Sequence, residues 1–135
     1  MADNCIFCKI ANGEIPSATL YEDEDFRVIL DLGPASKGHA LIIPKAHAAN
    51  LFELPDETAA KVLVIAKQIA GKLQEGLHAD GVNLVQNNGE AANQTVLHFH
   101  MHIIPRYYGD TVNMKWNPGT LTEENKEEIL ALFDK

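Results

Sequence analysis

The sequence predicts an α+β domain with a mostly antiparallel five-stranded sheet, one long helix and short terminal helices. Three observations support this expectation. Five short segments have strand character, and consecutive strand segments are joined by short connections, which favours antiparallel pairing. One longer segment carries apolar side chains at helical spacing. The 135 residues contain no internal repeat and are enough for one core, so we expect a single domain over 1–135.

The chain is expected to begin with a short helix over Cys5 to Ala11. Asp3 or Asn4 would cap this helix, and Gly13 follows its end. The next 30 or so residues alternate between apolar runs and turn residues, which is typical of strands joined by tight connections. The three strands expected there cover residues 18–22, 26–32 and 39–44.

The long helix is expected to begin at Pro55 and Asp56 and to run to about Glu75, where Gly76 would stop it. Val64 and Ile65 add apolar surface outside its apolar stripe, so one-sided packing would not bury the whole helix. It is therefore either sandwiched inside the fold or buried at a subunit contact, and we predict a homodimer. The stripe itself consists of Ala59, Val62, Leu63, Ala66, Ile69, Ala70 and Leu73.

The remaining elements follow in order. A fourth strand is expected over 81–86, then a polar loop over 87–94, and a fifth strand that ends near Arg106. The loop after it, 107–119, contains the single tryptophan. Thr122 would cap a final helix, because the acidic residues behind it suit a helix N-terminus.

The fifth strand carries the most informative pattern, three histidines on alternate residues. Because side chains alternate across a strand, His98, His100 and His102 would share one face. One interpretation is a transition-metal site, although residues along one straight strand diverge too far to reach one ion. Another is a nucleophilic imidazole that attacks phosphorus, with neighbours that donate hydrogen bonds. A histidine-rich solvent face is the third. The opposite, core face would hold Leu97, Phe99, Met101 and Ile103.

Bulk properties exclude some classes of function. The net charge of −8 disfavours non-specific nucleic-acid binding, which needs clustered basic residues. No run of about 18 apolar residues exists, so no membrane span is expected. The N-terminus has no secretory pattern, so we expect a cytoplasmic protein with reduced thiols. Cys5 and Cys8 could then be a redox pair, half of a metal site, or two buried thiols.

Residues 94–103 resemble the signature of the histidine triad (HIT) superfamily, in which histidines alternate with apolar residues. Ile104-Pro105-Arg106 is more similar to the fragile-histidine-triad branch, Asn93 stands where Hint enzymes usually have glycine, and the tail from Tyr107 resembles neither branch. The resemblance covers residues 5 to about 106. The segments that resemble the Hint branch, in order, are 5–10, 13–16, 21–23, Asp31, 38–45 with His47, and Asn87 with Gly89.

The resemblance implies a nucleotide hydrolase or transferase that acts at the α-phosphate through a nucleotidyl–histidine intermediate. By position, the resemblance implies that His100 is the nucleophile through Nε2, with its Nδ1–H held by a backbone carbonyl, expected to be that of His98. His102 contacts phosphate and leaving-group oxygens, and His39 is a fourth histidine near the pocket. These four form the predicted catalytic set. The predicted substrate-binding residues are Asp31 at the ribose, then Asn87, Gln94 and Thr95 at the phosphate, and Ile6, Phe7, Ile10, Ile29 and Leu32 along the base slot.

Plain core packing is the alternative for the five apolar residues. A structural zinc site is also predicted, because Cys5 and Cys8 with His47 and His98 make two thiolates and two imidazoles. Buried reduced thiols and a surface His47 are the alternative. No cofactor is expected in the chemistry itself.

The predicted substrate is a purine nucleotide, such as a nucleoside phosphoramidate. A dinucleoside polyphosphate hydrolase is the nearest alternative, and a zinc-stabilised nucleotide-binding module with little turnover is another. No nucleic acid or membrane partner is expected. In the predicted homodimer, Trp116 and the tail would reach the pocket of the partner.

Overall fold

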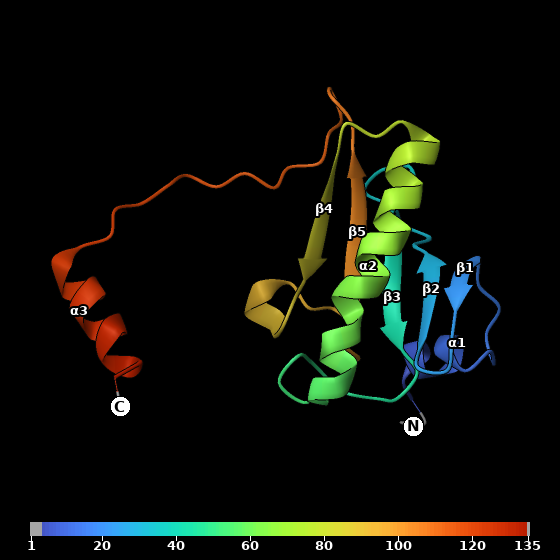
Figure 1. Ribbon diagram of the computed structural model, residues 1–135, viewed down its shortest axis with the longest axis horizontal. Coiled ribbons are helices and arrows are strands. Elements are labelled where there is room, and N and C mark those ends of the chain that lie inside the picture. The colour runs from blue at the N-terminus through green and yellow to red at the C-terminus, as the bar shows by residue number, and fades with distance from the viewer. Residues whose placement is uncertain (1–3, 135) are drawn as a thin grey trace.

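In the computed structural model, which describes residues 4–134, five strands form one antiparallel sheet in the order β1-β2-β3-β5-β4 (Figure 1). One long helix, α2 (Asp56–Leu77), covers one face of this sheet, and a short helix, α1 (Ile6–Ala11), lies against the other. The predicted α+β fold is therefore confirmed. The strands are β1 (Thr19–Glu22), β2 (Phe26–Leu30), β3 (Ala40–Pro44), β4 (Gly81–Gln86) and β5 (Met101–Arg106).

The central strand β3 is buried on both faces, since all five of its residues are buried. Ala40 and Ile42 point into the main core beneath α2, whereas Leu41 and Ile43 pack with α1. This alternation follows from the two-residue period of a strand. It also gives the α1 face its own small apolar floor, on which the pocket described below is built.

Two helix ends differ from the prediction. Cys5 caps α1, because its Sγ accepts a hydrogen bond from the Cys8 N–H at 3.3 Å. Asn4 is therefore not the cap, and Asp3 lies outside the described residues. Gly76 does not stop α2, which continues to Leu77 and ends at His78 in the left-handed region, with φ 54°.

The histidine segment is only partly a strand, since β5 begins at Met101. The backbone N–H of Phe99 leaves the sheet and donates to the carbonyl of Ala48 at 2.7 Å. Strict alternation is therefore lost before Met101. Leu97, predicted on the core face, is 68% exposed, while Phe99 and Ile103 are buried as expected.

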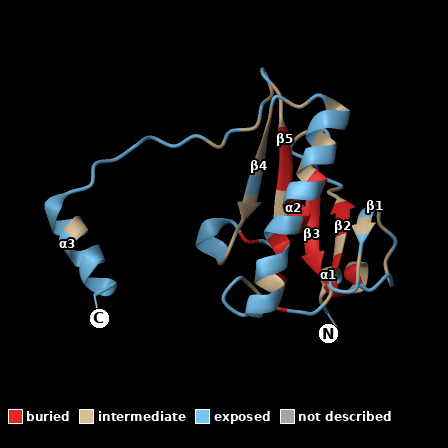
Figure 2. Cartoon of the chain, viewed as in Figure 1, coloured by how far each residue is buried: buried red, intermediate tan, exposed pale blue. Residues whose placement is uncertain are grey.

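The C-terminal arm, which we define as residues 113–134, extends away from the sheet past β4 (Figure 1). It ends in α3 (Glu123–Leu132), which Thr122 caps as predicted, and no residue of α3 is buried (Figure 2). The base of the arm is fixed by Arg106, which pairs with Asp110 and donates to the Val112 carbonyl at 2.9 Å. Among the described helices, none is long and apolar enough to cross a membrane.

Candidate active site and metal centre

A hollow of about 400 Å³ opens on the α1 face of the sheet. Its walls are mostly apolar, and two imidazoles, one carboxylate and one threonine supply most of the polar side chains. Leu32 forms its exposed rim, being 98% exposed. The predicted site residues that line this hollow are Ile6, Phe7, Ile10, Ile29, Asp31, Leu32, Thr95, His100 and His102.

His100 is buried and has a fixed tautomer. Its Nδ1 lies 2.8 Å from the carbonyl oxygen of His98, which can only accept, so Nδ1 carries the proton. The lone pair is therefore on Nε2. Burial lowers the pKa of His100, although the His98 carbonyl and Asp31 oppose this shift. His100 consequently presents a neutral imidazole with an unprotonated Nε2, the form that a nucleophile requires.

His102 takes the opposite tautomer through a chain of hydrogen bonds. The backbone N–H of Ala35 donates to His39 Nδ1 at 2.9 Å, so neutral His39 carries its proton on Nε2. That Nε2 lies 2.9 Å from His102 Nδ1 and donates to it. The remaining proton of His102 is therefore on Nε2. The Ala35 amide thus acts through His39 to make His102 a hydrogen-bond donor at Nε2.

The charges of these two imidazoles follow from their surroundings. Burial and then the neighbouring His100 and His39 lower the pKa of His102 to about 4. Burial also lowers the pKa of His39, against the attraction of Asp31. Both rings are therefore neutral near pH 7, and His102 donates from a neutral imidazole rather than from an imidazolium.

Asp31 lies at the edge of the hollow just after β2. Its Oδ1 accepts from the Gly33 N–H at 2.8 Å, and its Oδ2 lies 3.6 Å from His39 Nε2. Its side chain keeps 25% of its surface exposed, so the carboxylate is accessible to a ligand. A carboxylate placed there can accept hydrogen bonds from two adjacent hydroxyl groups.

Two residues predicted at the phosphate, Asn87 and Gln94, do not line the hollow. Gln94 is 7% exposed, and its side chain is already fully engaged by backbone groups of three loops. It accepts from the Gly89 N–H at 2.8 Å and donates to the carbonyls of Ala49 and Val96 at 2.6 and 3.0 Å. Asn87 is half-buried, and it too is absent from the lining of the hollow.

Asn93 lies next to Gln94 in the same loop. It is exposed and adopts the left-handed conformation, with φ 71°, where it ends the short helix η1 (Glu90–Ala92). Asparagine is one of the few side chains that tolerate this region well, which accounts for its standing at a glycine position.

A separate cluster brings together all four predicted metal ligands. Cys5 Sγ and Cys8 Sγ lie 3.2 and 3.4 Å from His98 Nδ1. His47 Nδ1 lies 3.3 Å from Cys8 Sγ and 3.2 Å from His98 Nδ1. The four atoms all lie within 4.8 Å of one another. His98 is therefore not part of the row formed by His100 and His102, whose ring centroids are 5.1 Å apart.

The chemistry of the cluster fits a tetrahedral metal ion. Zn–S bonds near 2.3 Å and Zn–N bonds near 2.05 Å give tetrahedral edges of roughly 3.3–3.8 Å, close to the separations of these atoms. His98 Nε2 donates to the Pro44 carbonyl at 2.8 Å, so the lone pair of His98 is on Nδ1, the atom in the cluster. These residues therefore form a possible Cys2His2 metal site.

A second group with metal-ligand atoms, Asp31, His39 and His102, does not fit an ion equally well. His39 Nδ1 already accepts from the Ala35 amide, so a metal on Nε2 would require a doubly deprotonated ring or the loss of that bond. We interpret this group as a hydrogen-bond chain.

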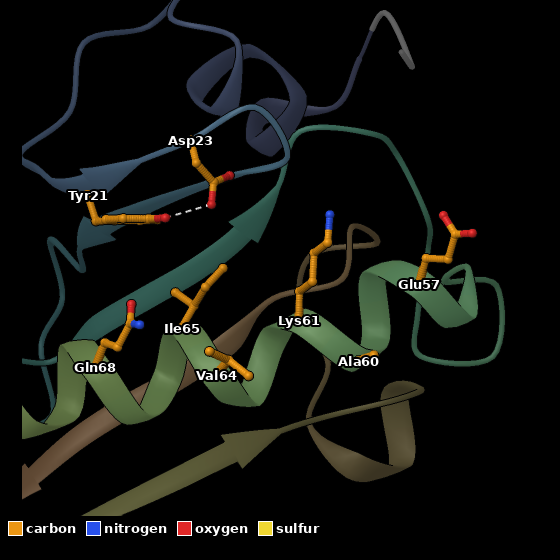
Figure 3. Close-up of a pocket in the computed structure, with 8 residues that line it drawn as sticks. All are labelled: Tyr21, Asp23, Glu57, Ala60, Lys61, Val64, Ile65 and Gln68. Atoms are coloured by element: carbon orange, nitrogen blue, oxygen red, sulfur yellow. Dashed lines mark hydrogen bonds between the residues drawn. The ribbon is translucent and has the colours of Figure 1, made fainter.

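Another hollow, of about 540 Å³, lies between α2 and the β1–β2 hairpin, on the opposite face of the sheet (Figure 3). There Tyr21 donates to Asp23 Oδ2 at 2.7 Å, and Val64 and Ile65 contribute apolar surface. It contains no histidine, cysteine or predicted site residue.

Sequence reasoning missed the Ala35 amide and the Pro44 carbonyl, which fix the proton positions of the site. Both are backbone groups, so no pattern of side chains could have indicated them. Ile15, Pro16 and Ala18 also line the hollow and were not predicted, although they lie in the segment that follows α1.

The described residues thus form a five-stranded α+β domain with two adjacent histidines in a mostly apolar hollow. A family model described as "HIT domain" matches residues 12–109, and the chain belongs to this family. The predicted family is thus confirmed.

Individual relatives agree with this membership. The adenosine 5'-monophosphoramidase hnt1 of Schizosaccharomyces pombe is 47% identical over 103 residues, which cover 76% of this chain and 74% of that protein. A crystal structure of a HIT family protein from Bacillus anthracis aligns over 98% of this chain and 96% of its own, with 41% identity and a TM-score of 0.90. A Zn-bound histidine triad family protein from Mycobacterium smegmatis aligns over 96% and 95%, with 42% identity and a TM-score of 0.78.

Proposed function

We propose that the protein is a nucleotide hydrolase or transferase that acts at the α-phosphate through a nucleotidyl intermediate on His100. The observation that carries this proposal is the opposite protonation of two adjacent imidazoles in one hollow. His100 has its lone pair on Nε2, and His102 has its proton there. A nucleophile and a hydrogen-bond donor are the two groups that displacement at phosphorus requires.

In the proposed reaction, His100 Nε2 attacks the α-phosphorus and a P–N bond forms as the bond to the leaving group breaks. The ring gains positive charge, and its Nδ1–H donates more strongly to the His98 carbonyl, which stabilises that charge. His102 Nε2–H forms a hydrogen bond to the leaving nitrogen, which takes its proton from water and departs as the neutral amine. A water molecule then attacks the same phosphorus, the P–N bond to His100 breaks, and the proton of that water passes to solvent, which leaves the nucleoside monophosphate and neutral His100.

The hollow supports a nucleoside substrate. Its apolar walls suit a flat base, and Asp31 suits the two ribose hydroxyls. We favour a purine nucleoside phosphoramidate, because relatives named adenosine 5'-monophosphoramidase are 46–47% identical to this chain. Dinucleoside polyphosphates remain the alternative substrate, and nucleotide binding with little turnover is the alternative without catalysis.

A comparison of three substrates tests the proposal. Turnover of adenosine phosphoramidate should exceed that of diadenosine triphosphate and diadenosine tetraphosphate, and rapid quenching should trap a nucleotidyl adduct on His100 by mass spectrometry. His78→Asn is a matched control, since that exposed histidine does not line the hollow and asparagine tolerates its left-handed backbone conformation at the end of α2. Binding of AMP without turnover or adduct would instead support the binding module.

Zinc is the metal we propose for the Cys2His2 cluster, with a structural role because all four positions are filled by the protein. A chelator should lower the melting temperature, since metal binding energy appears as folding energy. The variant Cys5→Ser with Cys8→Ser should reproduce this loss. Elemental analysis well below one zinc per chain, in protein prepared without chelators, would refute the metal site.

A homodimer is the assembly we propose. On the exposed side of α2, Leu63 and Val64 are 61% and 57% exposed, and Leu84 on the edge strand β4 is 43% exposed. The C-terminal arm runs past this same edge with α3 unburied (Figure 2). Exposed apolar surface of this kind favours association. Sedimentation should give a dimer, and Leu63→Glu should shift it towards the monomer; a wild-type monomer at micromolar concentration would contradict the proposal.

A further inference from the structure

We propose that the Cys2His2 cluster is a positioning device for the nucleotide hollow, and not only a staple for the fold. The proposal rests on the function proposed above. Bound metal would hold α1 against the sheet, and α1 supplies one wall of the hollow. The cluster would therefore set the affinity for nucleotide while the rest of the domain stays folded without it.

The first observation concerns the two sides of α1. Cys5 and Cys8 direct their sulfur atoms to His98, at 3.2 and 3.4 Å. The residues between and after them line the hollow: Ile6, Phe7 and Ile10. One short helix thus carries two metal ligands on one side and the apolar wall of the slot on the other.

A helix of this length does not hold itself in place. α1 has six residues, and isolated helices shorter than about 12 residues are unstable in water. Its C-terminal end is fixed by Arg27, whose Nε donates to the Ala11 carbonyl at 3.2 Å. Its N-terminal end has Cys5 as the cap, and the same sulfur belongs to the cluster. Phe7 packs on the apolar cluster of Ala11, Ile29, Leu41 and Ile43, and the Cys2His2 cluster fixes the end of α1 that carries it.

The second observation is that Phe7 contacts both sites. The centroid of its ring lies 6.1 Å from the centroid of the His98 ring and 4.9 Å from that of the His100 ring, and both pairs are edge to face. His98 connects the sites a second time, since its ring belongs to the cluster while its carbonyl accepts the Nδ1–H of His100. A displaced His98 would break the hydrogen bond from His100 Nδ1–H to its carbonyl, and this bond fixes the tautomer of His100.

The main core lies elsewhere. It is formed between α2 and the sheet, where residues such as Val28, Ile42 and Ile69 are buried. No residue of α1 belongs to it. The sheet and α2 can therefore remain packed when α1 is released, and this separates a positioning role from a general loss of folding.

The test measures AMP affinity by calorimetry, with zinc bound and after chelation, at a temperature where circular dichroism shows both forms folded. We expect chelation to weaken AMP binding about tenfold or more, because loss of one apolar wall removes contact area worth about that factor. Added zinc should restore the affinity. Hydrogen exchange should accelerate at residues 6–12 and stay unchanged in α2.

Ile69→Ala is the matched control, because it destabilises the core beneath α2 without touching α1 or the hollow. It should lower the melting temperature yet leave AMP affinity unchanged in the zinc form. A metal-free, folded protein that binds AMP within twofold of the zinc form would overturn the proposal. If chelation accelerates hydrogen exchange equally in α1 and α2, the proposal is also overturned, since the metal would then stabilise the whole domain and not α1 in particular.

If the metal-free form unfolds, the claim that the domain stays folded without the metal is wrong, and a cobalt-substituted protein then tests the coupling between the cluster and the hollow. The visible bands of Co²⁺ report its ligand geometry, so AMP should shift them through Phe7 and His98; unchanged bands on saturation with AMP would count against the coupling. If the zinc form itself binds no AMP, the proposed function is wrong. Hydrogen exchange at residues 6–12, compared with and without zinc, then shows by itself whether the cluster holds α1 in place.

Discussion

Replacing Gln94 with alanine should destabilise the domain far more than it impairs phosphate binding. The Gln94 side chain makes three hydrogen bonds, at 2.8, 2.6 and 3.0 Å, and is 7% exposed. Each buried hydrogen bond contributes about 1 kcal/mol net, so their loss costs about 2–4 kcal/mol. For a domain of this size, that lowers the melting temperature by about 10 °C.

The assay is urea unfolding followed by far-ultraviolet circular dichroism. Protein and zinc concentrations must be held constant, because the stability of a dimer or metalloprotein depends on both. Asn87→Ala is the matched control on the same loop. The one hydrogen bond of its side chain among the described residues is a long one, 3.5 Å to the Asn93 carbonyl, so its loss should cost less than about 0.5 kcal/mol.

The alternative is the original prediction from sequence, in which Gln94 contacts the phosphate. That role predicts a KM raised about tenfold or more with an unchanged unfolding midpoint. If Gln94→Ala raises KM in this way and leaves the unfolding midpoint unchanged, the structural role inferred from its three hydrogen bonds is refuted. If stability falls while KM stays within a few-fold, Gln94 acts by holding the loops of Ala49 and Gly89 together.

Three further predictions concern the hollow. His100→Ala should lower kcat by about a thousandfold or more with the fold intact, and a loss of only two- or threefold would rule it out as nucleophile. The depressed pKa of His102, about 4 against 6.5, means that the unfolded chain binds the extra proton first, so stability should fall as pH drops from 6.5 to 4. His102→Asn should flatten that slope in unfolding curves measured at each pH. Asp31→Asn should weaken AMP binding several-fold but leave 2',3'-dideoxy-AMP unaffected; equal losses for both ligands would remove the ribose role.

Regular periodicity was enough to predict the sheet and α2, because apolar spacing dictates which face is buried. It failed at Leu97 and His98, which precede β5: the neighbouring Phe99 donates its N–H to the Ala48 carbonyl instead of to the sheet, and the two-residue alternation is lost there. The four residues of the Cys2His2 cluster were predictable as a group from residue type, because two cysteines and two histidines are a common set of zinc ligands. The hydrogen bonds of Gln94 could not be predicted, because they depend on carbonyls brought close only by the fold.

The Ala35 amide has a consequence for which substitutions the site accepts. A side chain at position 35 takes no part in the chain of hydrogen bonds, since only its N–H is used. Evolution is therefore free to vary the residue there, with proline as the one exception, because proline lacks that hydrogen. Among homologues the position should look unremarkable to any conservation score, while Ala35→Pro should disturb His102 as severely as a change to a histidine of the motif.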